Sequence, residues 1–464
     1  MVIGHSMTDS EKIREIIKRR KFKVYFIGIG GISMSALAEI SQKRGAVVFG
    51  SDIRKSGITE RLTLMGIGIK YTQLRANIME ASPDIAVYSL SISSDNPEYR
   101  AARELGITVA SRAEYLGVLM EDYGTRLGVS GSHGKSTTTA MLASALSVDG
   151  KAPTVLCGAE LSRATGYVHG GEDFLVYEAC EYCDSFLKLR PSVQVVLNID
   201  LDHTDYFSGT EQLCESFFKA ASSAEKFAVL NADCPNIKSI LPGLGGKAVT
   251  YSSLPGADFG YEIKKASRGF CGIRLFGDGK EYSFSLGVPG RFNAENAVAA
   301  AVAALKLGVS EAAVSDALSG FHGIPRRLEL ISKKRGADIY YDYAHHPKEI
   351  EALSAAFTAI GYKNICAVFA PHTYSRTKSF LDEFARALAG FAAAYVTDIY
   401  GAREGAIVGV SSAALAESVR AAGGKAYALA NEESLDKILS EGYDCIVLMG
   451  AGDLDKIKKK IEDM

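Results

Sequence analysis

Residues 128–139, GVSGSHGKSTTT, follow an apolar run and contain most of a phosphate-binding loop. The common loop reads G-x-x-x-x-G-K-[ST]. Its end matches residues 134–136, but Val129 stands where the first glycine belongs, so the loop has the shorter form G-x-x-G-K-[ST] from Gly131. A helix beginning at the lysine would present unpaired N–H groups to an anion. We predict a strand, a phosphate loop and a helix here; the alternative is a glycine-rich turn without a ligand.

Apolar runs of strand length alternate with helix-length segments on both sides of this loop. Three blocks emerge, which begin near residues 23, 125 and 325. This alternation favours parallel sheets with helices on both faces. Residues 245–290 differ, because they are rich in Gly and Ser and carry short alternating runs, as in small antiparallel strands. With 464 residues and roughly 100–200 per domain, we predict an α/β chain of three domains, 1–122, 123–323 and 324–464.

Composition and charge exclude several classes of protein. Lys and Arg number 52 against 54 Asp and Glu, so no global field favours nucleic acid or an anionic membrane. The most lipid-like stretch, residues 297–305, is too short to span a bilayer, and the first 20 residues lack an apolar signal region. Eight cysteines in this length form no disulfide framework. We expect a cytoplasmic protein that neither binds nucleic acid nor inserts into a membrane.

A second glycine-rich turn, GIGGIS at residues 28–33, follows the first apolar run. The dinucleotide fingerprint G-x-G-x-x-G would need glycine where Ser33 stands, although Asp52 follows at the expected distance. The turn suits NAD or another diphosphate equally well, and a simple tight turn is the third alternative.

Two acidic clusters follow apolar runs of the central block. They are YEACEYCDSF at 177–186 and NIDLDHTDYF at 198–207, with Glu178, Glu181, Asp202, His203 and Asp205. Carboxylates and imidazole beside a phosphate loop suit Mg²⁺ coordination during phosphoryl transfer. A capping arrangement at a strand end is the alternative for each.

Arginines, asparagines and histidines gather in the last third of the chain. Arg326, Arg327 and Arg376 can clamp phosphate or carboxylate, and Asn293 and Asn296 can hydrogen-bond a base. His345 and His346 are adjacent, and adjacent residues of a strand point to opposite faces, which argues against one shared metal.

In this order, the motifs resemble those of the ATP-dependent Mur ligases over almost the whole chain. The shortened loop GSHGKSTTT is the form of that superfamily. The other motifs are FIGIGGISMSALA with GSD, EACEY, NIDLDHTDYF, GRFNAENA, GIPRRLE, YDYAHHPKE, APHTYSRT, TDIYGAREGAIVGVS and MGAGDL. The resemblance implies a Rossmann-like N-terminal domain for a UDP-sugar, a central P-loop ATPase domain with a parallel and a small antiparallel sheet, and a Rossmann-like C-terminal domain for the amino acid.

The resemblance also implies the reaction and its site. ATP, with Mg²⁺ or Mn²⁺, would drive the joining of L-alanine to the lactyl carboxylate of UDP-N-acetylmuramate through an acyl phosphate. Catalysis would involve Lys135, Glu178, His203 and Arg327, with the metal on Ser136, Glu178 and His203. ATP would bind Gly131, Ser132, His133, Gly134, Lys135, Ser136, Thr137, Asn293, Asn296, Arg327 and Asp342. The UDP-sugar would bind Gly28, Ile29, Gly30, Gly31, Ile32, Ser33, Asp52 and Ser91. The amino acid would bind Tyr343, His345 and Arg376.

One position departs from the pattern, and three other functions stay open. Some family members carry arginine where this chain has Thr373, which leaves Arg376 alone in that loop. Lys219 is a weak candidate for the modified, metal-binding lysine of several members. The open alternatives are a muropeptide-recycling ligase that adds a tripeptide to UDP-N-acetylmuramate, a nicotinamide oxidoreductase and a plain NTPase switch.

Overall fold

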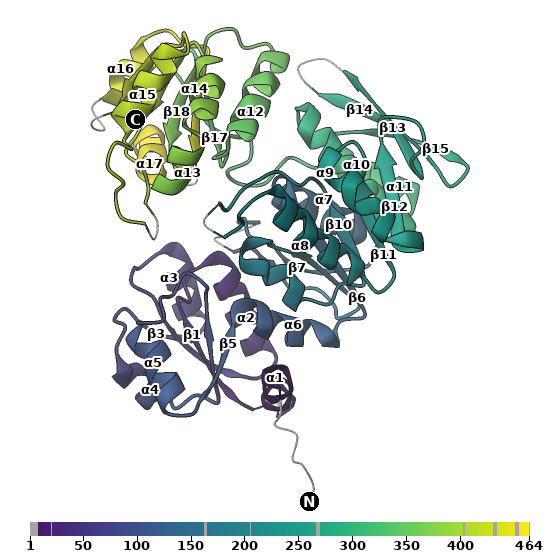
Figure 1. The fold of residues 1–464 in the computed structure, drawn as a ribbon, viewed down its shortest axis with the longest axis vertical. Helices are drawn as coiled ribbons and strands as arrows, with labels where there is room; N and C mark the ends of the chain where they lie inside the picture. Colours follow the sequence, from purple (N-terminus) through teal and green to yellow (C-terminus); the bar gives the residue numbers. More distant parts are fainter. Residues whose placement is uncertain are drawn as a thin grey trace, which may run out of the picture.

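Each of the three blocks of apolar runs folds into its own sheet, and Figure 1 shows the sheets as three lobes in chain order. The structure is a computed structural model that describes residues 8–19, 21–161, 165–204, 206–265, 270–401, 404–429, 434–450 and 454–463. Strands and helices alternate as expected, so the α/β fold class is confirmed. Among the described residues, no helix is both long and apolar enough to cross a membrane.

The N-terminal sheet has five strands in the order β3-β2-β1-β4-β5, all parallel. Strand β1 lies in the middle and pairs with β2 on one side and β4 on the other. The strand order reverses at this point, and ligands of open α/β sheets bind at such points, beyond the carboxyl ends of the strands. The elements are α1 (Asp9–Lys18), β1 (Lys23–Ile27), α2 (Ile32–Lys43), β2 (Val47–Ser51), α3 (Gly57–Leu64), β3 (Gly68–Lys70), α4 (Arg75–Ala81), β4 (Ile85–Tyr88), α5 (Pro97–Glu104), β5 (Thr108–Ser111) and α6 (Arg112–Leu119).

The central sheet is mixed and has ten strands, in the order β15-β14-β13-β12-β11-β10-β6-β9-β7-β8. The expected antiparallel strands are β13, β14 and β15, and they extend the parallel sheet, because β13 also pairs with β12 in parallel. The strands are β6 (Thr125–Ser130), β7 (Thr154–Leu156), β8 (Tyr167–Val168), β9 (Phe174–Glu178), β10 (Val193–Val196), β11 (Phe227–Asn231), β12 (Ala248–Ser252), β13 (Phe259–Lys265), β14 (Cys271–Gly277) and β15 (Lys280–Ser285). The helices are α7 (Lys135–Val148), α8 (Thr210–Ser222), α9 (Pro235–Ile240), α10 (Arg291–Lys306) and α11 (Glu311–Ser319).

The alanine-rich stretch at residues 297–305 forms part of α10, which packs against α7 in the central core. Its alanines are buried, and their small side chains let the two helices approach closely. The helix that begins with the phosphate loop is therefore fixed against the core along its length.

The C-terminal sheet has six strands in the order β16-β17-β21-β18-β19-β20, and all pairs except β16 with β17 are parallel. Strand β18 is buried at every position, as expected for the middle of a parallel sheet. The elements are β16 (Glu329–Lys334), β17 (Ala337–Asp342), α12 (Pro347–Ile360), β18 (Ile365–Ala370), α13 (Tyr374–Ser379), α14 (Leu381–Ala389), β19 (Ala393–Val396), α15 (Ser412–Ala421), β20 (Ala426–Ala428), α16 (Ser434–Ser440), β21 (Cys445–Gly450) and α17 (Asp455–Asp463).

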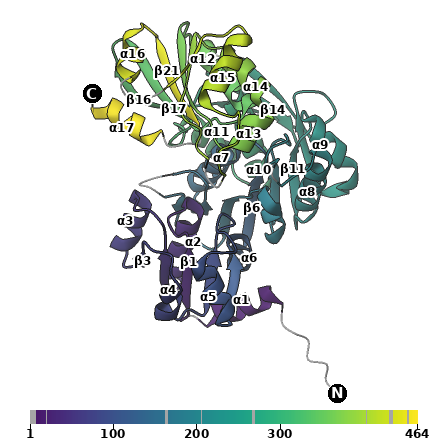
Figure 2. The same ribbon diagram turned by 60° about the vertical axis from the view of Figure 1, so that its left-hand side comes forward.

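Strand register places the polar segments of the central domain at one edge. Strand β6 lies between β9 and β10, and Val129 pairs with Glu178 while Ser130 pairs with Val196. The phosphate loop therefore leaves the sheet between Glu178 and the segment after β10. Figure 2 shows α7 in the middle of the molecule, with the N-terminal lobe below it and the C-terminal lobe above.

Candidate active site

The phosphate loop adopts a shape that requires its two glycines. Gly131 and Gly134 have φ of +145° and +84°, a region that side chains disfavour. A Cβ on Gly134 would lie 2.3 Å from Oδ1 of Asn296. Ser132 Oγ donates to the carbonyl of Asp200 at 2.7 Å, and the N–H of His133 donates to Asn198 Oδ1 at 2.8 Å. Neighbouring segments of the fold hold the loop in this shape.

Lys135 points back into this loop and forms an ion pair with Glu181. Its Nζ lies 2.5 Å from the carbonyl oxygen of Gly131 and 3.1 Å from both carboxylate oxygens of Glu181. Burial alone would lower the pKa of Lys135, but the carboxylate of Glu181 raises it above its ordinary value. The carboxylate of Glu181 therefore favours the charged form of the lysine. The EACEY motif contains Glu181, which the site prediction omitted in favour of Glu178.

The three side chains expected to bind the metal come from three neighbouring segments. Ser136 lies in the first turn of α7, Glu178 ends β9, and His203 has a φ of +51° in the segment after β10. Glu178 Oε1 accepts the N–H of Gly158 at 2.6 Å and lies 2.8 Å from Cys157 Sγ, while His203 Nε2 lies 3.9 Å from Glu181.

Ser136, Glu178 and His203 suit Mg²⁺ that is also bound by substrate and water, and they do not form a complete metal site of protein ligands alone. In the described parts of the chain, no group of three or more His, Cys, Asp or Glu side chains could hold a metal ion. Mg²⁺ commonly takes one or two carboxylates together with substrate phosphates and water. A hydroxyl, a carboxylate and an imidazole beside a phosphate loop leave room for such ligands.

A cavity of about 210 Å³ lies between the phosphate loop and the C-terminal domain. Seven of the residues expected to bind ATP line it: His133, Gly134, Thr137, Asn293, Asn296, Arg327 and Asp342. Both oxygens of Asp342 accept backbone N–H groups, from Leu328 at 2.7 Å and Ala344 at 2.8 Å, and burial raises the pKa of this carboxyl to about 6. Its carboxylate therefore fixes the chain that crosses between the two domains.

The loop after β1 is braced in a similar way. The N–H groups of Gly28 and Ile29 both donate to the carbonyl of Ser51 at 2.9 Å, and that of Gly30 donates to Asp52 Oδ2 at 2.9 Å. Gly31 caps α2, in which Ile32 and Ser33 are the first residues. Asp52 thus shapes the loop directly. Ser91 follows β4, the neighbour of β1, and its Oγ lies 2.9 Å from that of Ser89.

The N-terminal and central sites meet at a small cavity. Ser33 and Glu178 both line it, together with Arg112 and Cys157. The loop expected to bind the UDP-sugar and a predicted metal ligand therefore line the same cavity, although they are 145 positions apart in the sequence (178 minus 33).

The residues expected to bind the amino acid gather after strands β17 and β18. The rings of Tyr343 and His345 lie 5.2 Å apart, and His345 Nδ1 lies 2.9 Å from the carbonyl oxygen of Tyr343. Arg376 Nη1 lies 2.9 Å from Nδ1 of His372. Arg376 also pairs with Asp202 of the central domain at 2.9 Å. A surface ion pair of Arg376 with the nearby Asp382 or Glu383 would be the alternative to a role in a binding site. That alternative is wrong, since the guanidinium is buried and its carboxylate partner is Asp202.

The adjacent histidines lie beyond the strand in which they were expected. Strand β17 ends at Asp342, and His346 caps α12. The two rings still have different neighbours, because His345 faces Tyr343 whereas His346 packs 4.9 Å from the ring of His133.

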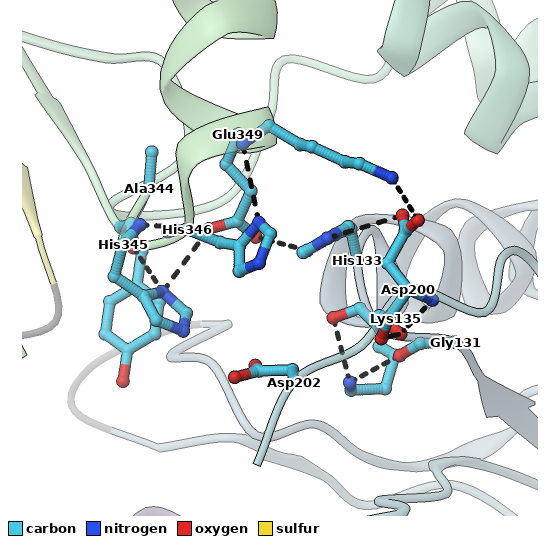
Figure 3. Close-up of polar contacts among 12 residues, drawn as sticks. Gly131, His133, Lys135, Asp200, Asp202, Ala344, His345, His346 and Glu349 are labelled. Carbon is cyan, nitrogen blue, oxygen red and sulfur yellow. Dashed lines mark hydrogen bonds and ion pairs between the residues drawn. The ribbon is translucent and has the colours of Figure 1, made fainter. Parts of the chain in front are cut away.

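Charged contacts connect the C-terminal domain to the phosphate loop, as Figure 3 shows. His133 Nδ1 lies 3.1 Å from Glu349 Oε1, and its Nε2 lies 3.6 Å from Asp200 Oδ2. Lys348 also pairs with Asp200. Burial would lower the pKa of His133, but the hydrogen bond and charge of Glu349 raise it. No sequence motif indicated these pairs, and only the charges of the residues were visible.

Other residues considered at the sequence level lie outside this arrangement. Lys219 is exposed on α8 and pairs with Glu215 at 2.8 Å, and its role as a modified, metal-binding lysine stays a prediction. Asp205 lies outside the described residues, as do parts of the GAREG and MGAGDL motifs, residues 402–403 and 451–453.

The fold and this site together define a Mur ligase. Three family descriptions match successive parts of the chain: the catalytic domain of the Mur ligase family at residues 23–124, the Mur ligase middle domain at 129–304, and the Mur ligase glutamate ligase domain at 326–452. The chain belongs to the Mur ligase family.

Individual relatives carry a more specific name. The chain is 39% identical to UDP-N-acetylmuramate–L-alanine ligase of Caldicellulosiruptor bescii, over 94% of this chain and 97% of that one. The same name belongs to a protein of Acetivibrio thermocellus at 39% identity, over 95% and 96%. The crystal structure of UDP-N-acetylmuramate-alanine ligase MurC from Thermotoga maritima matches with a TM-score of 0.81 at 28% identity, over 95% and 98%. A murein peptide ligase of Psychrobacter arcticus shares the fold, with a TM-score of 0.70 at 22% identity, over 95% and 98%.

We expect the burial of His346 to lower the free energy of unfolding at acidic pH. Burial lowers the pKa of His346 to about 4, against an ordinary 6.5. Between these values the unfolded chain binds a proton that the folded chain does not, so stability falls as pH falls from about 6.5, by up to about 1.4 kcal/mol per pH unit. In His346→Asn, asparagine keeps a side chain suited to the helix cap and removes the titration. Urea denaturation at pH 6.5 and 5 should give a smaller loss for this variant than for the wild type.

The exposed His322 provides the matched control. His322→Asn should leave the pH dependence of the free energy of unfolding as it is in the wild type. Equal slopes for His346→Asn and the wild type would contradict the prediction.

Proposed function

We propose that this protein joins L-alanine to the lactyl carboxylate of UDP-N-acetylmuramate, with conversion of ATP to ADP and phosphate. One observation carries the proposal: residues from all three domains meet around the Lys135–Glu181 pair. His203 lies beside Glu181, Arg376 pairs with the adjacent Asp202, and Ser33 lines a cavity together with Glu178. The names of relatives at 37–39% identity over nearly the whole chain support the choice of substrates. The reaction belongs to peptidoglycan precursor synthesis, and its nucleotide substrates assign it to the cytoplasm.

The chemistry requires a strongly cationic site. The carboxylate is a poor electrophile, so its oxygen first attacks the γ-phosphorus of ATP, and ADP leaves. The neutral amine of alanine then attacks the acyl phosphate, and the tetrahedral intermediate expels phosphate and loses a proton. Two anions meet in the first step, and fixed cations stabilise the charge that develops. Lys135 and Arg327 are the cations that this chain contributes.

Three sets of residues would hold the substrates. ATP would bind Gly131, Ser132, His133, Gly134, Lys135, Ser136, Thr137, Asn293, Asn296, Arg327 and Asp342. The UDP-sugar would bind Gly28, Ile29, Gly30, Gly31, Ile32, Ser33, Asp52 and Ser91. Tyr343, His345 and Arg376 would bind the amino acid. These sets divide among domains that we assign to residues 1–122, 123–323 and 324–464.

Mg²⁺, with Mn²⁺ as a substitute, would sit on Ser136, Glu178 and His203. Bound there, it would neutralise charge on the phosphates during the transfer. The hydroxyl, carboxylate and imidazole of this set surround Lys135 and the phosphate loop, where that charge develops.

Phosphate release with each substrate omitted in turn tests the proposal. We expect release only when ATP, UDP-N-acetylmuramate, L-alanine and Mg²⁺ are all present. Release from ATP alone would indicate an NTPase switch, and binding of NAD would indicate an oxidoreductase. A preference for the tripeptide L-alanyl-D-glutamyl-diaminopimelate over L-alanine would indicate the recycling ligase.

Lys135→Ala should abolish at least nine-tenths of ligation. The variant loses the cation that would contact the phosphates. Removing a comparable charge-stabilising group typically costs about 3 kcal/mol of transition-state stabilisation. Phosphate release at saturating substrates measures the effect, and calorimetry with UDP-N-acetylmuramate should give unchanged binding. More than a tenth of the activity remaining would contradict the role.

Arg376→Lys should raise the KM for L-alanine at least tenfold, which corresponds to about 1.4 kcal/mol. A planar guanidinium binds a carboxylate through two parallel hydrogen bonds that an ammonium cannot reproduce. Alanine titrations measure the change. The KM values for ATP and UDP-N-acetylmuramate should stay within about threefold of their wild-type values. An unchanged alanine KM would remove Arg376 from the substrate site.

A further inference from the structure

The Asp202–Arg376 pair joins the central domain to the C-terminal domain at the proposed amino-acid site. The two residues are 174 positions apart in the sequence. Asp202 Oδ1 accepts from Arg376 Nε at 3.1 Å and from Nη2 at 2.9 Å. Both side chains are 9% exposed, so water contributes little to either.

Each partner is also held by its own domain. The backbone N–H of His203 donates to Asp202 Oδ1 at 2.8 Å, which fixes the carboxylate beside a proposed metal ligand. On the other side, Arg376 Nη1 lies 2.9 Å from His372 Nδ1. The plane of the guanidinium is therefore fixed by one group from each domain.

A guanidinium has five N–H donors in one plane. Asp202 takes the edge made by Nε and Nη2, which leaves N–H groups on the two Nη atoms for another acceptor. Without the carboxylate, a long arginine side chain would have to be ordered when the substrate binds, and ordering it costs conformational entropy.

We propose that Asp202 is a positioning residue for the amino-acid substrate, and that the carboxylate-binding site is complete only when the central and C-terminal domains are closed on each other. The inference rests on the proposed function of Arg376. It assigns to the central domain a share of a site that the sequence motifs place wholly in the C-terminal domain.

The other possible role for Asp202 is that of a competitor, which the substrate carboxylate would displace. Displacement would leave a buried carboxylate without its cation, next to the incoming one, and an unpaired buried charge is strongly unfavourable. The geometry therefore favours a carboxylate that stays in place while the substrate binds.

Steady-state kinetics of Asp202→Asn, Asp202→Glu, Arg376→Lys and one double variant tests the inference. Asp202→Asn removes the charge and keeps the size, and we expect it to raise the KM for L-alanine at least tenfold while kcat falls less. Asp202→Glu, which restores the charge, should recover part of this loss. The double variant Asp202→Asn with Arg376→Lys should bind alanine little worse than the poorer single variant, because both substitutions remove the same interaction.

Asp200 provides a matched control on the same segment. It also pairs with a cation of the C-terminal domain, Lys348, but not with Arg376. Asp200→Asn should change the alanine KM by less than threefold. The KM for ATP, measured for every variant, shows that the protein is folded and that the central site is intact.

Three results would overturn the inference. An alanine KM that falls or stays the same in Asp202→Asn would mean that Asp202 competes with the substrate or plays no part. An equal rise of the alanine KM in Asp200→Asn would mean that loss of any ion pair between the two domains weakens alanine binding, whichever residue forms it. If Arg376→Lys raises the alanine KM and Asp202→Asn does not, this inference fails alone; if neither does, the proposed role of Arg376 fails with it.

Discussion

A partly buried ammonium beside a buried carboxylate is the constraint on which the central site depends. The side chain of Lys135 is only 17% exposed, and a charge that is largely withdrawn from water needs a partner, because burying it alone is costly. Glu181, which is 2% exposed, supplies that partner, and the carbonyl of Gly131 supplies a further acceptor. Phosphates that bind here enter a site whose cation is already in place. The free-energy cost of burying that cation is therefore part of folding and does not oppose substrate binding.

The junction with the C-terminal domain follows the same physical rule. His133 meets Glu349, Lys348 meets Asp200, and Arg376 meets Asp202, each as an opposite pair across the boundary. Charges that are brought together when domains close must be paired, or closure is opposed by desolvation. The acyl phosphate of the proposed reaction hydrolyses in water, so a closed junction also protects it. Pairing therefore serves both the association of the domains and the chemistry.

The elements near the chain's motifs could be predicted from the sequence, but the contacts between distant segments could not. The strand, loop and helix around residues 125–148 follow from local rules for apolar runs, glycines and helix ends, and the structure contains them as β6, the loop and α7. Asp202 was visible as a polar residue after a strand, yet its partner lies 174 residues away in a helix of another domain. Glu181 was noted as acidic but left out of the predicted site, because EACEY contains two carboxylates and the sequence does not show which one reaches Lys135.

Contacts within the fold hold strained backbone at the junction of the central and C-terminal domains. Four residues other than glycine there have left-handed φ: His203 at +51°, Arg326 at +61°, Leu328 at +50° and Thr373 at +66°. Such conformations cost about 1–3 kcal/mol each and persist only where surrounding contacts determine them. Those contacts are present: the N–H of His203 donates to Asp202, and that of Leu328 to Asp342. Thr373 caps α13 by accepting the N–H of Arg376 with its side-chain hydroxyl. The strained threonine therefore fixes the start of the short helix that carries Arg376, whose guanidinium then meets Asp202 of the central domain.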